Sequence, residues 1–249
     1  MQVEGSSCSS ALTLSEFEAN AFAGACLTRS RGSRFVARLL KTCFLSWLFV
    51  LLGAVSVRAG IEQSMMATAP PAPSNRFAFG AKEVENMMGA FFFFDTTQNQ
   101  RPSIDFALDS LRLGIMLNDP WDIGPLSGNF EALGEVFVGG VFTGPGNVLA
   151  GATLVFRYNF VQPKARVVPY MQIGAGGVYT DIPEDESRGL ISLPVEFNLQ
   201  AGVGTRFLVN DHWSINVEGV YRHISNAEIH KPNFGIDSVG GNLGFGFSF

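Results

Sequence analysis

The chain has 249 residues and a net charge of −5; 47% of its residues are apolar and only 16% are charged. Soluble domains usually carry charges on about a quarter of their residues, so this composition favours a membrane protein. No basic patch is present, which argues against nucleic acid as a partner. The one continuous apolar run, 44–57, is short for a spanning helix, and the other apolar residues often alternate with polar ones among 28 glycines. The pattern predicts strands.

Residues 1–59 are predicted to be a leader with a signal peptide. Basic residues precede the apolar run 44–57, which has the length of an h-region, and Val57 and Ala59 offer small side chains before a cleavage site. The alternative is an N-terminal anchor, which the short run disfavours; a translation start nearer Val36 would account for the long leader. The three cysteines all precede Ala59, so the mature chain is expected to hold no disulfide and no thiolate metal site.

After the leader, residues 60–85 form a Pro-rich segment expected to be extended and periplasmic. Residues 86–249 are predicted to form an all-β domain whose strands are separated by turn residues. The eight predicted strands cover residues 86–95, 103–117, 128–142, 148–160, 166–180, 190–208, 212–225 and 236–249. An even number of long strands predicts a closed, eight-stranded antiparallel transmembrane β-barrel of the outer-membrane type.

Alternation along these strands gives each side chain a direction. In 212–225 the odd positions are mostly apolar, whereas the even ones carry His212, Glu218 and Arg222. In a membrane barrel the apolar face meets lipid and the polar face fills the lumen. The lumen is therefore expected to hold a salt-bridge network; its members would be Arg157, Glu196, Arg206, Glu218 and Arg222. In 103–117 the alternation changes phase near Ser110 and Leu111, which suggests a bulge there.

A soluble β-sandwich or lipocalin-like barrel would show the same alternation with the apolar face turned inward. The signal peptide, the cysteine-free mature chain and the C-terminal Phe249 favour the membrane instead, and a final strand with alternating aromatics resembles the assembly signal of bacterial outer-membrane barrels. The expected location is the outer membrane. With both termini in the periplasm, the hairpin 226–235 would lie at the cell surface.

Three polar residues interrupt the apolar face near this hairpin. His223 and Ser225 are two residues apart and share one face of their strand, and Asp237 shares the parity of Val239 and Leu243 in the next strand. Polar side chains facing lipid are costly and are usually functional. A nucleophile, a base and an acid are the components of a catalytic triad, although polar residues at the headgroup boundary have the same composition.

The segment from Tyr221 to Asp237 resembles the C-terminal hairpin of the outer-membrane lipid A 3-O-deacylases, through its His-x-Ser-Asn and Pro-Asn-x-Gly motifs and the acid that follows. The resemblance implies that Ser225 is the nucleophile, His223 the base and Asp237 the acid, and that Asn226 helps to hold the oxyanion. The acid is a Glu in a known member of the family, and Asp237 is one methylene shorter. Glu228 is a competing acid, ranked below Asp237 because it lies in the surface loop.

The function expected is therefore an outer-membrane esterase that removes the 3-O-linked acyl chain of lipid A and needs no cofactor or metal. The alternatives are a non-catalytic barrel for adhesion or envelope stability, and a lipid acyltransferase. The expected partner is lipid A or lipopolysaccharide in the outer leaflet, and a homodimer is compatible with the sequence.

Overall fold

The computed structural model describes residues 76–94, 101–182 and 189–249. The predicted leader (1–59) and most of the Pro-rich segment (60–85) lie outside the described residues. Within the described ranges, no helix has the length and apolar character needed to cross a membrane.

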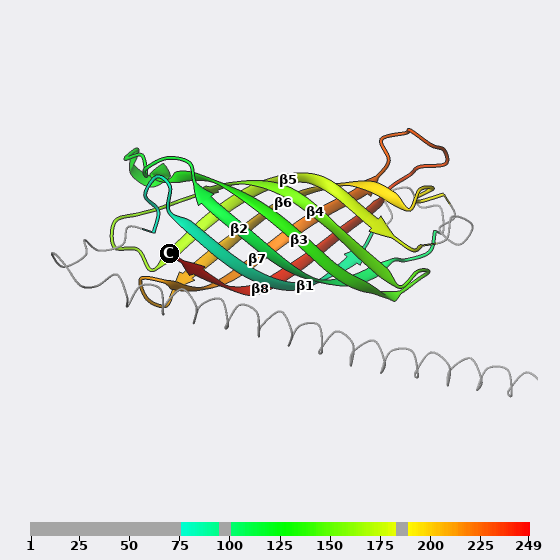
Figure 1. The fold of residues 1–249 in the computed structure, drawn as a ribbon, viewed down its shortest axis with the longest axis horizontal. Coiled ribbons are helices and arrows are strands. Elements are labelled where there is room, and N and C mark those ends of the chain that lie inside the picture. The colour runs from blue at the N-terminus through cyan, green and yellow to red at the C-terminus, as the bar shows by residue number, and fades with distance from the viewer. Residues whose placement is uncertain (1–75, 95–100, 183–188) are drawn as a thin grey trace, which may run out of the picture. The chain divides into compact units, whose positions relative to one another are not determined.

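The described residues form eight antiparallel strands that close into one barrel, because each strand pairs with its neighbours in the chain and β1 pairs with β8 (Figure 1). The predicted fold class is confirmed. The short helix η1 (Gly124–Leu126) lies between β2 and β3. The strands are β1 (Lys82–Phe93), β2 (Asp105–Met116), β3 (Asn129–Thr143), β4 (Val148–Asn159), β5 (Val167–Thr180), β6 (Val195–Leu208), β7 (Trp213–Ser225) and β8 (Ile236–Ser248).

The polar faces of the strands point into the barrel. Glu218, Arg222 and Arg206 are buried, although a soluble barrel of the opposite orientation would expose them. Val203, Val217 and other apolar residues at alternate positions are exposed on the outer wall. An apolar outer wall is what a barrel in a lipid bilayer requires.

A network of buried ion pairs fills the part of the lumen nearer the C-terminus. Arg112 donates two hydrogen bonds to Glu218 (3.0 and 2.7 Å) and one to Glu135 (2.9 Å). Arg157 donates two hydrogen bonds to Glu85, at 2.8 and 2.9 Å. The predicted network is thus present, with one exception: Glu196 accepts the backbone N–H groups of Ser192 and Leu193 instead.

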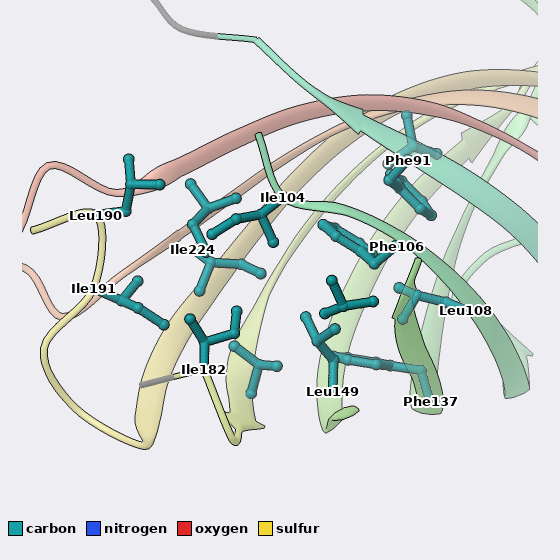
Figure 2. Close-up of a cluster of buried hydrophobic side chains, with 14 residues drawn as sticks. Phe91, Ile104, Phe106, Leu108, Phe137, Leu149, Ile182, Leu190, Ile191 and Ile224 are labelled. Carbon is teal, nitrogen blue, oxygen red and sulfur yellow. The ribbon is translucent and has the colours of Figure 1, made fainter. Parts of the chain in front are cut away.

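A cluster of buried apolar side chains occupies the opposite end of the lumen, toward the β7–β8 loop (Figure 2). Phe91, Phe106 and Phe137 form one side of it, and Leu190 and Ile191 cover it from the β5–β6 loop. Alternation did not predict this layer. Together the charged and the apolar layers fill the described barrel with side chains, so a substrate is expected to approach from outside the barrel.

The apolar layer also explains the phase change in β2. The pairing of β2 with β3 is continuous through Ser110 and Leu111, and its irregularity lies between Asp105 and Phe106 instead. The bulge expected near Ser110 was therefore wrong. The lumen is apolar beside Phe106 and charged beside Arg112, so the inward face of β2 changes character without any change of register.

Two strands, β1 and β6, begin well away from the predicted positions, whereas the others begin at or close to them. β1 begins at Lys82 rather than at 86, because Glu83 and Glu85 point into the lumen and pair with its arginines. β6 begins at Val195 rather than at 190. Leu190 belongs to a loop instead, where it enters the apolar cluster and its carbonyl accepts a hydrogen bond from the N–H of Gly235 (2.7 Å).

Candidate active site

The register between β7 and β8 brings the three predicted site residues together. His223 is the direct cross-strand partner of Asp237, and Ser225 lies two residues beyond His223 on the same face of β7. Side chains directly opposite each other in an antiparallel pair have Cβ atoms roughly 5 Å apart. The short side chain of Asp237 therefore reaches the imidazole without an additional methylene.

The three side chains form a continuous chain of contacts. Nδ1 of His223 lies 2.8 Å from Oδ1 of Asp237, and Nε2 of His223 lies 2.9 Å from Oγ of Ser225. With the proton on Nδ1, the imidazole donates to the carboxylate and its Nε2 can accept the proton of the serine hydroxyl. The side chains of His223 and Asp237 keep 27% and 17% of their surface exposed, so the site opens to the outside of the barrel.

Asn226 lies next to these residues in the chain, but its side chain points elsewhere. It is buried, and its amide donates hydrogen bonds to Oγ of Ser192 (3.0 Å) and to the carbonyl of His230 (3.1 Å). Its backbone N–H donates to the side-chain oxygen of Asn233 at 3.2 Å. Asn226 therefore connects the β7–β8 loop to the β5–β6 loop, and its amide is not directed at Ser225.

The competing acid, Glu228, is remote from the imidazole contacts. It is well exposed in the β7–β8 loop and pairs with Lys231, its carboxylate oxygen lying 3.5 Å from Nζ. The acid brought to His223 is Asp237.

The β7–β8 loop is fixed by the loop beside it. The backbone N–H groups of Phe234 and Gly235 donate to the carbonyls of Gly189 (3.0 Å) and Leu190 (2.7 Å). Leu190 is in turn buried in the apolar cluster. The packing inside the lumen thereby helps to fix the segment that leads into β8 and to Asp237.

Two residues at the site were missed by the sequence argument. The hydroxyl of Tyr221 donates a hydrogen bond of 2.5 Å to Oδ1 of Asp237. Gly235 has a φ of +81°, and a Cβ at this position would lie 2.5 Å from Cε1 of His223. Tyr221 lies two residues before His223 and therefore on the same face of β7, which the sequence alone already indicated.

Comparison with protein families shows which family this chain belongs to. The family model for lipid A 3-O-deacylase (PagL) matches residues 110–246, more than half of the chain. This chain belongs to the lipid A 3-O-deacylase family. With its apolar outer wall and closed barrel, it is an outer-membrane protein, as the sequence predicted, and lipid A is the substrate that family membership implies.

Solved structures of outer-membrane barrels are similar over most of their own length. The outer-membrane enzyme PagL is 21% identical, with a TM-score of 0.45, over 65% of this chain and 97% of that chain. Neisserial surface protein A is 13% identical, with a TM-score of 0.45, over 68% and 97%. The N-terminal barrel domain of Pseudomonas aeruginosa OprF is 16% identical, with a TM-score of 0.41, over 68% and 99%. No match was found among the curated proteins.

Proposed function

We propose that this protein is an esterase that removes the 3-O-linked acyl chain of lipid A by a Ser–His–Asp mechanism. The observation that carries the proposal is the contact chain from Ser225 through His223 to Asp237 on the outer wall of the barrel. A hydroxyl nucleophile that faces lipid is suited to an ester bond within a lipid.

In the proposed reaction, Oγ of Ser225 attacks the carbonyl carbon of the ester while Nε2 of His223 accepts the hydroxyl proton. Asp237 holds the imidazole through its Nδ1–H and stabilises the imidazolium that forms. The imidazolium then donates the proton to the departing sugar oxygen, which leaves an acyl-enzyme on Ser225. A water molecule, deprotonated by the same imidazole, then attacks the acyl carbon, and the fatty acid is released as the imidazolium returns the proton to Oγ of Ser225.

The oxyanion needs donors, and we propose that two backbone N–H groups in the loop after the nucleophile supply them. Ala227 and Glu228 have φ values of +53° and +63°, an uncommon conformation for non-glycine residues. In the part of the chain that the structure describes, neither backbone N–H has an acceptor. Successive N–H groups in such a turn can bind an anion. Because Asn226 fixes this loop through Ser192 and His230, we propose that it supports the oxyanion indirectly rather than through its own amide.

The neighbouring strand provides a surface for the acyl chain. Phe197 and Leu199 of β6 are the cross-strand partners of Ser225 and His223, and both side chains are exposed on the outer wall. An acyl chain lying along β6 would present its ester carbonyl to Ser225. With periplasmic termini, this surface would lie at the level of the outer leaflet, which supports lipid A as the substrate.

Product analysis tests the proposal. The full chain is expressed in a bacterium whose lipid A keeps its 3-O-acyl chain, and lipid A is examined by mass spectrometry beside an empty-vector control. Loss of the mass of one hydroxyacyl chain, with recovery of the free fatty acid, is expected. A gain of one chain on another lipid would instead indicate an acyltransferase, and unchanged lipids would indicate a non-catalytic barrel.

Replacing Gly235 with Ala is expected to lower kcat by roughly 100-fold, because a 1 Å displacement of a reacting group has an effect of this order. The added methyl group would occupy the space beside Cε1 of His223 and push the ring away from Ser225. Gly80 is the matched control, because it also has a positive φ but has nothing within 4 Å of the added Cβ. If both variants fold and G235A is as active as G80A, the role given to His223 would be contradicted.

A further inference from the structure

A fourth polar side chain on the outer wall, that of Tyr221, contacts Asp237 of the candidate site. Oδ1 of Asp237 accepts two hydrogen bonds, one from the imidazole of His223 at 2.8 Å and one from the hydroxyl of Tyr221 at 2.5 Å. The contact chain thus runs from Ser225 through His223 to Asp237 and ends at Tyr221. The mechanism proposed above gives Tyr221 no role.

The strand register explains how Tyr221 reaches the carboxylate. Tyr221 pairs with Val239, two residues along β8 from Asp237, so it occupies the diagonal position relative to Asp237. Diagonal neighbours in an antiparallel pair lie within reach of aromatic side chains. The ring of Tyr221 also lies 6.1 Å from that of Phe94, whose backbone N–H donates to the carbonyl of Asp237 (3.1 Å). Both the backbone and the side chain of Asp237 are therefore held from this side.

The position of Asp237 explains why a second hydrogen-bond donor to its carboxylate is stabilising. A carboxylate on a lipid-facing wall has little water to satisfy it, and an unpaired charge there is costly. Its short side chain rotates about few bonds, and the single donor on His223 would leave that rotation less restricted. A second donor on the same oxygen fixes the side chain with Oδ1 toward the imidazole.

We propose that Tyr221 is a positioning residue, which acts on the reaction only by holding the Asp237 carboxylate against His223. The inference rests on the proposed function, since it assigns Tyr221 to the same site. Loss of the hydroxyl would therefore leave the carboxylate less firmly held against His223.

The test is Tyr221→Phe, which keeps the ring and removes the hydroxyl. We expect kcat to fall about tenfold, as loss of one hydrogen bond to a charged group predicts, with KM unchanged. Tyr179→Phe is the matched control, because Tyr179 is also exposed and lies near the same end of the barrel on β5. A rise in KM with kcat unchanged would contradict the proposal, as would a kcat of Y221F equal to that of Y179F.

A double-mutant cycle separates this proposal from the function on which it rests. In an Asp237→Ala background, Tyr221→Phe is expected to have no further effect on kcat, because the group through which it acts is gone. A tenfold fall in that background as well would overturn the positioning role and leave the triad intact. An Asp237→Ala protein as active as the wild type would instead overturn the proposed mechanism. Circular dichroism in detergent micelles checks that each variant keeps its strands.

Discussion

Replacing Ser225 with Ala is expected to lower kcat on lipid A by about 10⁶-fold, the loss seen when a serine hydrolase is deprived of its nucleophile. The physical reason is that, among the residues that the structure describes, Ser225 alone brings a hydroxyl to Nε2 of His223, at 2.9 Å from its Oγ. The residual rate would come from substrate binding and oxyanion donors alone. The measurement is single-turnover release of fatty acid from purified lipid A in mixed micelles.

Substitutions of residues that act together in catalysis have strongly non-additive effects on kcat, and this allows a second test. His223→Ala should cost about as much as Ser225→Ala, and the double variant should be no worse than either. Ser103→Ala is the matched control, because Ser103 is an exposed hydroxyl just before β2. If the Ser225→Ala protein still released the acyl chain at a rate near that of S103A, the serine mechanism would be wrong.

The strand parity needed for this site could be predicted because it depends only on local spacing. Alternation placed His223, Ser225 and Asp237 on one face, and the structure gives these residues the same face. By the same alternation, Asn226 shares the inward-facing side of the strand with Ile224. In the structure its amide contacts the neighbouring loop rather than Ser225. The oxyanion role for its side chain came from the family resemblance, which carries no information about direction.

The contact between Asp237 and His223 could not be predicted, because it depends on how residues 226–235 close the hairpin. A shift of one residue in register would have placed another side chain opposite His223. The loop conformation depends in turn on Gly189 and Leu190, which lie far away in the sequence and bind the backbone of Phe234 and Gly235. Tyr221 was missed for a different reason: it was counted among the apolar residues that define the lipid face, although its hydroxyl is a donor.

Replacing Arg157 with Met is expected to lower the free energy of unfolding by about 3–5 kcal/mol, the usual cost of removing one partner of a buried ion pair. Arg157 donates two hydrogen bonds to Glu85 and one to Gln172 (3.0 Å), and its Nη1 also lies 3.4 Å from Glu83. Without it, the buried carboxylates of Glu83, Glu85 and Glu131 share the remaining arginine contacts, chiefly those of Arg206. The measurement is guanidinium unfolding in detergent micelles, followed by circular dichroism.

Two controls test whether the loss of stability comes from the carboxylates that are left without Arg157. Arg166→Met makes the same change at an exposed turn residue and should leave the unfolding midpoint unchanged. The double variant Arg157→Met with Glu85→Met should recover most of the loss, because replacing both partners of a buried pair by apolar residues is often neutral. If R157M unfolded at the same midpoint as R166M, the lumen would be stabilised by packing alone. Activity per folded molecule should be unchanged in R157M, since the lumenal network and the outer wall that carries Ser225 are on opposite faces of the strands.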